Sequence, residues 1–325
     1  MWSFVGCGLQ YDKRNADNVV RWLQEHANDD KPWVLFASFV CPHPPYIAQD
    51  LPFPAQWQQA DWPDHPAMTT MRHFFHLEEP FSEVELHKLT AAYSGVTTYV
   101  DGQIGRVPNA LNDLGLAETT RVIYASDHDE SLGARGLFGK FTMYEESAAI
   151  PFIMAGPDMP QGKMVNTPIS LVDCFPTILE AVGAASSSED ASLPGESLWA
   201  IAQGDDQQRA VLSEYHALAA ENAYFMLRDR QHKLIYHVNA PPQLFDLAND
   251  PDETIDLAPS PGHQAALQRL EQQLRNIVDP EAADAQAKAD QRAKIEAFGG
   301  EDAVRQRGAF DNSPVPGEKP AFRKH

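Results

Sequence analysis

The chain has 325 residues, 43% of them hydrophobic, which is enough to bury a sizeable core in one large domain with an appendage or in two domains. Its 46 acidic residues outnumber 25 basic ones, and the formal charge of −21 disfavours nonspecific binding to nucleic acid or to an anionic membrane surface. Three widely spaced cysteines form no disulfide framework, so we expect a protein of the reducing cytoplasm, and no apolar run has the length of a membrane span.

Helices and buried strands alternate along the first half of the chain. In order, the patterns predict a helix over 15–26, a strand over 32–40, a helix over 83–114 that is broken or kinked near Pro108, strands over 121–125 and 151–156, and a helix over 171–182. This alternation favours a mostly parallel sheet covered by helices. Residues 44–80, rich in Pro, Trp and His, indicate a long ordered insertion near the mouth of a site.

The second half has a different organisation after a small, polar boundary at 184–190. Closely spaced strand candidates at 210–216, 223–228, 233–237 and 243–247 predict an antiparallel subdomain, followed by helices over 263–277 and 280–307. We assign 1–205 to a catalytic domain, 206–277 to the antiparallel subdomain, and 278–325 to a charged helical extension and flexible tail. That extension is also our candidate surface for a homo-oligomer.

A carboxylate and an imidazole, Asp127 and His128, follow directly after the predicted strand at 121–125. The carboxyl ends of strands are where ligands bind in open α/β sheets. An Asp oxygen and a His nitrogen together suit a divalent cation, and Lys140, which follows a glycine-rich loop, suits an anionic substrate. The alternative is that Asp127 and His128 only cap the loop and that Lys140 is a solvated lysine.

Several longer segments extend this pattern. The segments are 126–157, 39–46, 93–105, 170–179 and 244–251. Together they resemble the sulfatases of the alkaline phosphatase superfamily, in particular the subgroup of choline-sulfatase-like and phosphonate monoester hydrolase enzymes. The resemblance covers roughly residues 10 to 260. It implies an α/β alkaline-phosphatase-like α/β/α sandwich, incomplete at the N-terminus, with a small antiparallel α+β C-terminal subdomain.

The resemblance also implies roles for individual residues in a metal-dependent sulfuric ester hydrolase. Asp127 and His128 are the expected metal ligands, with Ca²⁺ as the family expectation and Mn²⁺ or Mg²⁺ open. Lys140 is expected to contact the substrate anion, and His43 to bind substrate and act as donor or general acid at the leaving oxygen. His216 is a further candidate for substrate binding, whereas His43 could alternatively be a turn histidine held between prolines.

Family members carry a metal-binding aspartate pair and a formylglycine nucleophile, made from Cys-x-Pro-x-Arg or Ser-x-Pro-x-Arg, in an N-terminal segment. Neither Cys7 nor Cys41 has proline two positions on, and Cys174, which does, has Ile178 where arginine is required. We therefore expect a truncated chain that lacks the formylglycine nucleophile and is inactive alone.

Other functions remain open. A phosphonate monoester or phosphodiester hydrolase would share these residues, so only substrate profiling separates it from a sulfatase. A phosphomutase or phosphatase of the superfamily needs a richer set of Asp and His ligands. A noncatalytic anion-binding or interaction module predicts binding without turnover, and a fragment that does not fold by itself is a fourth possibility. The partner expected throughout is a small-molecule sulfate or phosphonate ester, not nucleic acid or a membrane.

Overall fold

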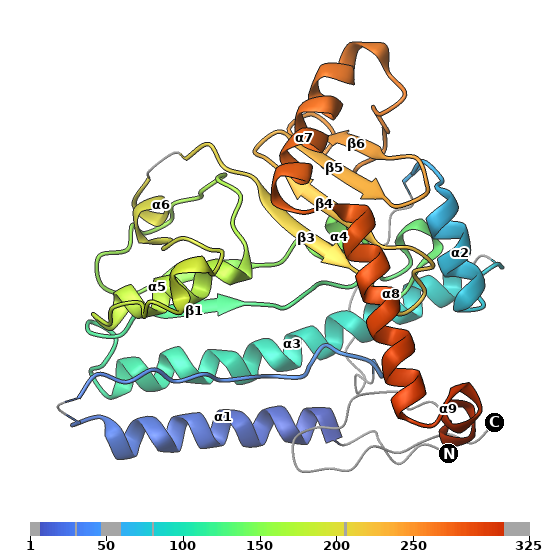
Figure 1. Cartoon of the computed structure of the whole chain (residues 1–325). Coiled ribbons are helices and arrows are strands. Elements are labelled where there is room, and N and C mark those ends of the chain that lie inside the picture. Colours follow the sequence, from blue (N-terminus) through green and yellow to red (C-terminus); the bar gives the residue numbers. More distant parts are fainter. Residues whose placement is uncertain (1–6, 30, 47–59, 80, 205–206, 309–325) are drawn as a thin grey trace.

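The structure, a computed structural model, describes residues 7–29, 31–46, 60–79, 81–204 and 207–308 (Figure 1). The helices are α1 (Cys7–His26), α2 (Pro66–Phe74), α3 (Glu83–Asp113), α4 (Glu145–Ala148), α5 (Cys174–Ala181), α6 (Trp199–Gln203), α7 (Gln264–Ile277), α8 (Pro280–Ala297) and α9 (Glu301–Arg307). The strands are β1 (Val122–Ala125), β2 (Phe152–Ala155), β3 (Val211–Tyr215), β4 (Tyr224–Arg228), β5 (His232–His237) and β6 (Gln243–Asp246). No helix in these ranges is long and apolar enough to cross a bilayer.

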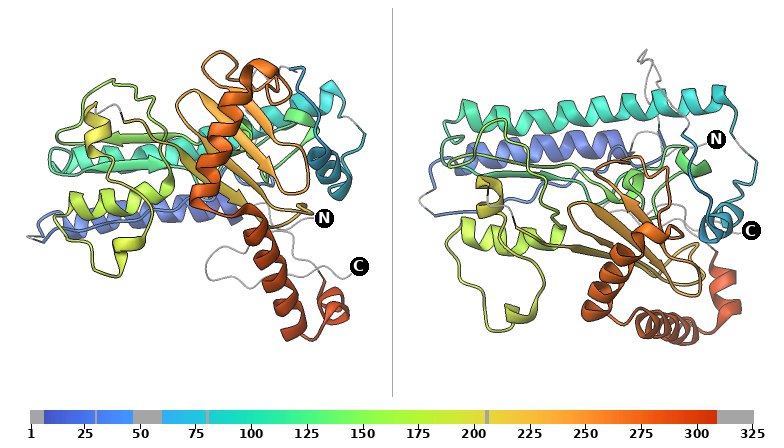
Figure 2. Two further views of the ribbon diagram at one scale, coloured as in Figure 1. Left: turned by 45° about the horizontal axis from the view of Figure 1, so that its top comes forward. Right: turned by 90° about the horizontal axis from the view of Figure 1, so that it is seen from above.

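The long helices α1 and α3 lie side by side on one face of the α/β part (Figure 1, Figure 2). A capping box starts α3, in which Ser82 Oγ accepts the Glu85 N–H while the Glu85 carboxylate accepts the Ser82 N–H. The helix then continues through Pro108, so the predicted break is not observed. Proline removes only one intrahelical hydrogen bond there, and the following turn packs its apolar residues against α1.

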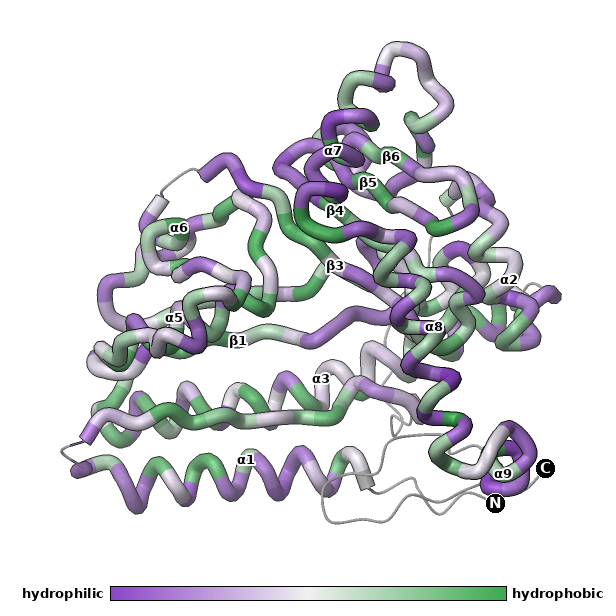
Figure 3. The backbone as a smooth tube through the Cα atoms, in the orientation of Figure 1, coloured by the Kyte–Doolittle hydropathy of each residue, from purple (hydrophilic) through white to green (hydrophobic). Residues whose placement is uncertain are grey.

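Residues 33–40, predicted to form a buried strand, run as extended backbone beside α1 and α3 without a ladder partner in the described chain. Trp33, Leu35 and Ala37 pack against the helices, whereas the alternate residues Val34 and Phe36 are 58% and 89% exposed. This period of two is that of a strand with one covered face. The strand predicted over 32–40 is thus not formed as a paired strand among the described residues, and the prediction that it is fully buried is wrong. Figure 3 shows the apolar character of this segment beside α1 and α3.

The predicted strands at 121–125 and 151–156 are confirmed as β1 and β2, but their pairing is antiparallel, with Val122 opposite Ala155 and Ala125 opposite Phe152. The expected mostly parallel sheet is therefore not observed among the described residues. Figure 2 shows β1 and residues 33–40 between the α1/α3 pair on one side and α5 on the other. The described residues thus combine helices with a two-stranded and a four-stranded antiparallel sheet.

The antiparallel subdomain predicted from the strand spacing is a four-stranded meander in the order β3-β4-β5-β6. Helix α7 lies across one face of it and contributes Leu267, Leu270 and Leu274 to a core shared with Phe225 and Leu244 (Figure 2). The helix predicted over 280–307 is two helices, α8 and α9, and along α8 hydrophilic and hydrophobic residues alternate (Figure 3). The predicted flexible tail from 309 onward lies outside the described residues.

A buried ion network joins the two parts. The Lys233 side chain in β5 is fully buried, and its Nζ lies 2.5 Å from a Glu145 oxygen, 2.8 Å from a Glu253 oxygen and 3.0 Å from the Met143 carbonyl oxygen. Glu253 is also fully buried and lies 3.4 Å from Arg135. Helix α4, which carries Glu145, is thereby fixed against the subdomain.

Candidate active site

Asp127 and His128 leave the C-terminal end of β1, as expected, and the local hydrogen bonds fix their orientation. Asp127 Oδ1 accepts the His128 N–H at 3.1 Å, and His128 Nδ1 lies 3.0 Å from the Asp129 carbonyl oxygen. A carbonyl accepts only, so Nδ1 carries the proton and Nε2 presents its lone pair. Because His128 Nε2 is 3.6 Å from Asp127 Oδ2, the two atoms are placed to bind one cation between them.

That pair alone is an incomplete coordination set. The carboxylate of Asp127 is 82% exposed, which leaves room for further ligands. Within the described ranges, no group of three or more His, Cys, Asp or Glu side chains is placed to hold a metal ion. The donor chemistry of Asp127 and His128 fits a divalent cation of the Ca²⁺, Mn²⁺ or Mg²⁺ kind, and the other ligands would be water or residues outside these ranges.

Lys140 is held near this pair by the loop that precedes it. The Glu130 carboxylate accepts the backbone N–H groups of Leu132 and Gly139, and the Ser131 N–H donates to the Gly139 carbonyl at 2.7 Å. Gly139 has a φ of +82°, which favours glycine. Burial lowers the pKa of Lys140. The negative charges of Glu130 and Asp127 oppose that shift, so both carboxylates act on the Lys140 ammonium group.

His43 reaches the same cluster from the loop after residues 33–40. Partial burial lowers the pKa of His43; a hydrogen bond to the Pro44 carbonyl opposes this, while the nearby charges of Lys140 and His128 lower it further. The His43 Nδ1 is 2.9 Å from that carbonyl oxygen, so its Nε2 faces the opposite way. The structure thus brings His43, Lys140, Asp127 and His128 together from separate loops.

Two tyrosines that sequence reasoning did not select complete the cluster. The rings of Tyr46 and Tyr93 meet edge to face at 5.4 Å. Burial, and then the neighbouring Glu130, raise the pKa of Tyr46; burial, and then Asp129 and Glu130, raise that of Tyr93. Both residues lie in segments that resemble the family, and this resemblance was the signal by which the sequence could have identified them. Glu130 interacts electrostatically with both rings and with Lys140, and Asp129 interacts with Tyr93.

His216 is not brought into this cluster. Its Nε2 lies 3.5 Å from Glu214, its ring packs against Phe225 at 5.3 Å, and the α8 residue Gln291 donates to its carbonyl. These contacts place His216 between β4 and α8.

Both free thiols that the structure describes, those of Cys41 and Cys174, have a raised pKa. Burial raises the pKa of Cys41, and a hydrogen bond with the Asp12 carboxylate raises it further. Burial likewise raises the pKa of Cys174 at the start of α5. A thiol with a raised pKa is a poor nucleophile at neutral pH.

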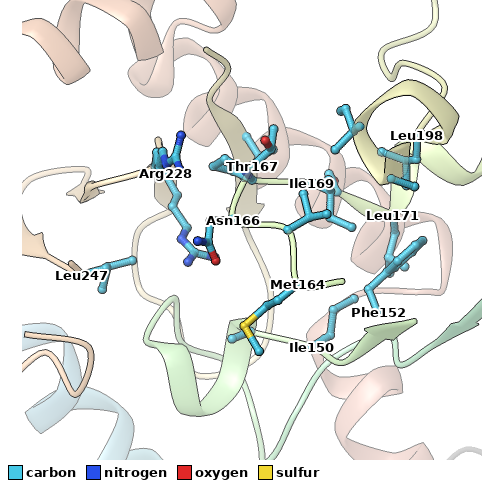
Figure 4. Close-up of a pocket in the computed structure, with 18 of the residues that line it drawn as sticks. Ile150, Phe152, Met164, Asn166, Thr167, Ile169, Leu171, Leu198, Arg228 and Leu247 are labelled. Carbon is cyan, nitrogen blue, oxygen red and sulfur yellow. The ribbon is translucent and has the colours of Figure 1, made fainter. Parts of the chain in front are cut away.

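A cavity of about 980 Å³ opens beside Asp127, between β2, the loop over 163–171 and the end of β4 (Figure 4). Its apolar wall includes Ile150, Phe152 and Leu198, and its polar side includes Asn166 and Arg228. The cavity lies between the α/β part and the antiparallel subdomain, and residues of both line it.

Comparison with known proteins places these features in context. The family model described as sulfatase matches residues 2–184, and the model described as N-sulphoglucosamine sulphohydrolase, C-terminal, matches residues 133–279. Arylsulfatase K of Xenopus laevis is 29% identical over 307 residues, which cover 83% of this chain and 56% of the relative. Arylsulfatase K of Rattus norvegicus is 30% identical over 304 residues, which cover 83% of this chain and 53% of the relative. The chain thus spans about half the length of the curated relatives it matches.

Solved structures give the same fold. A phosphonate monoester hydrolase from Silicibacter pomeroyi superimposes with a TM-score of 0.66 at 25% identity over 80% of this chain and 58% of the other. A 2-O GAG sulfatase superimposes with a TM-score of 0.67 at 23% identity over 87% of this chain and 64% of the other. The chain therefore has the alkaline-phosphatase-like sulfatase fold.

Proposed function

Because this chain belongs to the sulfatase family, we propose that it forms part of a metal-dependent sulfuric ester hydrolase. The observation that supports this most directly is the meeting of His43, Lys140, Asp127 and His128 around one position at the end of β1. Two of these groups suit a cation and two suit the oxygens of a sulfate ester.

The chain's own residues can bind and polarise such an ester. The Lys140 ammonium would hold a sulfate oxygen and stabilise the charge that develops on it. His43 Nδ1 donates to the Pro44 carbonyl, so Nε2 would give a proton to the leaving alcohol only from the imidazolium form, and the lowered pKa of His43 makes that form a stronger acid but a less populated one at neutral pH. A divalent cation bound by Asp127 Oδ2 and His128 Nε2 would add positive charge next to the same oxygens. Glu130 and Gly139 keep Lys140 at that position.

The covalent step needs a nucleophile, which is a formylglycine in sulfatases. Cys41 and Cys174 do not suit the role because burial raises the pKa of each thiol. We therefore propose that the 325-residue chain binds sulfate esters without turning them over. Hydrolysis of a phosphonate monoester is the second candidate function, because the match to the Silicibacter pomeroyi enzyme covers 80% of the chain.

The test compares binding and turnover in the same preparation. We expect calorimetry to detect phenyl sulfate binding that Lys140→Ala weakens by roughly tenfold or more, since hydrogen bonds to charged groups contribute about 1.5–3 kcal/mol. Assays with p-nitrophenyl sulfate and a phenyl phosphonate ester should show no turnover. Phenyl sulfate binding that is indifferent to Lys140→Ala contradicts the proposed site. Robust turnover that disappears in Cys41→Ala would make Cys41 the nucleophile and overturn the mechanism.

A further inference from the structure

Phe141, the residue that follows Lys140, has an unusual backbone conformation. Its φ is +94°, the largest positive φ of any non-glycine residue in the described ranges. The left-handed region disfavours bulky side chains, so a phenylalanine stays there only where its surroundings hold it. Gly139, on the other side of Lys140, has a φ of +82°. Lys140 therefore lies between two residues whose φ angles are both in the left-handed region.

Contacts from two other elements hold Phe141. Its ring stacks on that of Phe75, the residue that caps the C-terminal end of α2, with the ring centroids 5.2 Å apart and the planes 23° from parallel. Its backbone carbonyl accepts a hydrogen bond from the hydroxyl of Tyr224, the first residue of β4. Tyr224 is 2% exposed and its ring stacks on Tyr215 at 5.2 Å, so this donor is itself fixed. The end of α2 and the antiparallel subdomain thus hold the backbone at Phe141.

The loop that precedes Lys140 is held from the other side. The Gly139 N–H donates to the Glu130 carboxylate, and the Gly139 carbonyl accepts the Ser131 N–H at 2.7 Å. A Cβ added to Gly139 would lie 3.1 Å from the Phe141 ring, so this ring packs against the backbone at Gly139. Because the backbone is held on both sides of Lys140, the point from which its flexible side chain extends is fixed.

We propose that Phe141 is a positioning residue for Lys140 and that Phe75 and Tyr224 act through it. The proposal rests on the proposed function, in which Lys140 holds a sulfate oxygen. Phe141 packs against the apolar cluster formed by α2 and the antiparallel subdomain, whereas Glu130 and Asp127 act on the ammonium group of Lys140. If the backbone at Phe141 relaxed to an ordinary φ, the Lys140 side chain would leave the chain in another direction and lose its alignment with the sulfate.

The test measures phenyl sulfate binding by calorimetry in the presence of Ca²⁺, using the 325-residue chain. Tyr224→Phe removes only the hydroxyl that donates to Phe141, and Phe141→Gly keeps the left-handed φ accessible but removes the ring. We expect each variant to weaken binding by at least about threefold, but by less than Lys140→Ala does, because a mobile ammonium group keeps its charge and loses a well-directed hydrogen bond. The conservative variant Phe141→Tyr keeps the ring and should bind as wild type.

A second measurement follows the Lys140 side chain directly. In protein labelled with ¹³C at the lysine Cε atoms, the NMR signal of Lys140 is the one that is missing from Lys140→Arg. We expect this signal to relax as that of an ordered side chain in wild type and Phe141→Tyr, and as that of a mobile side chain in Tyr224→Phe and Phe141→Gly. The signal would not change if Phe141 and Tyr224 only stabilised the fold.

Tyr144→Phe is the matched control. Tyr144 is 1% exposed and belongs to the same apolar cluster, but its hydroxyl donates to Gln243 Oε1, at 2.8 Å. We expect this variant to lose about as much stability in urea unfolding as Tyr224→Phe, with wild-type phenyl sulfate binding and an ordered Lys140 signal. An ordered Lys140 signal in both Tyr224→Phe and Phe141→Gly, or an equal weakening of binding in Tyr144→Phe, overturns the proposal.

The outcomes also separate this proposal from the proposed function. If Lys140→Ala weakens phenyl sulfate binding but Tyr224→Phe and Phe141→Gly bind as wild type, the sulfate site stands and the positioning role is wrong. If Lys140→Ala leaves binding unchanged while the Lys140 signal becomes mobile in those two variants, Phe141 does position Lys140 and the sulfate site is wrong.

Discussion

The substitution Lys233→Met tests the ion network that joins the subdomain to the α/β part. Methionine keeps the apolar length of the side chain but removes the charge, so Glu253, which is also fully buried, loses its contact at 2.8 Å. Glu253 retains Arg135 at 3.4 Å and the Glu145 N–H at 2.8 Å. Removing one partner of a buried ion pair costs about 3–5 kcal/mol, and the remaining partners place our expectation at about 3 kcal/mol of unfolding free energy.

The pH dependence of this loss has a definite sign. Burial raises the pKa of the Glu253 carboxyl, and loss of the Lys233 charge raises it further. As the pH falls below neutral, the folded variant takes up a proton at Glu253 at a higher pH than an ordinary glutamate would, and it no longer holds an unpaired buried charge. The stability deficit of Lys233→Met is therefore largest at neutral pH and becomes smaller as the pH is lowered.

Urea unfolding of wild type and variant at several pH values measures both quantities. Lys13→Met is the matched control, because Lys13 is exposed and its ion pair with Asp17 lies on the surface; we expect near wild-type stability. The double variant Lys233→Met/Glu253→Gln should recover part of the loss, since it removes the unpaired charge. A Lys233→Met protein within about 1 kcal/mol of wild type, or a deficit that does not change with pH, would refute the reasoning.

Three further predictions address the metal pair, the open strand and the backbone. Calorimetry should show only weak Ca²⁺ and Mn²⁺ binding that Asp127→Ala abolishes, because two side chains leave most coordination positions to water; tight one-to-one binding would mean that further ligands exist. Phe36→Ser should reduce binding of a hydrophobic dye with little change in unfolding free energy, since Phe36 is 89% exposed; a large loss of stability would show that the ring is packed. Gly156→Ala should destabilise the fold strongly, because Gly156 has a φ of +123° and an added Cβ would overlap the Thr120 carbonyl. At Gly102 in α3 an added Cβ meets no atom, so Gly102→Ala should stabilise the fold by about 0.5–1 kcal/mol. The reverse order in thermal unfolding would contradict the packing of β1 and β2.

Local patterns in the sequence were sufficient to predict the strands β1 to β6 and the metal-binding type of the residues at the end of β1. Strands β1 and β2 and the four strands of the meander follow from short apolar runs between turn residues, because burial and β propensity act within a few positions. The placement of Asp127 and His128 needed only the adjacent strand. The family could likewise be predicted from the sequence, since the motifs that resemble it follow one another in order along the chain.

Tertiary structure decided what depends on partners distant in sequence. The apolar run over 32–40 predicted a buried strand, but only the packed chain shows that one face meets α1 and α3 while Phe36 stays exposed, because burial requires a covering element. Pairing direction between β1 and β2 is likewise a long-range property that a single run cannot encode.

The candidate site depends on long-range packing in the same way. Tyr46 and Tyr93 are ordinary residues until folding places them beside Glu130. The type of a side chain fixes which bonds it can form. The sequence alone therefore determined the chemistry available to Asp127, His128, Lys140 and His43. Which charged groups come close together is set by the fold, since electrostatic and hydrogen-bond energies depend on distances and burial that no single segment specifies.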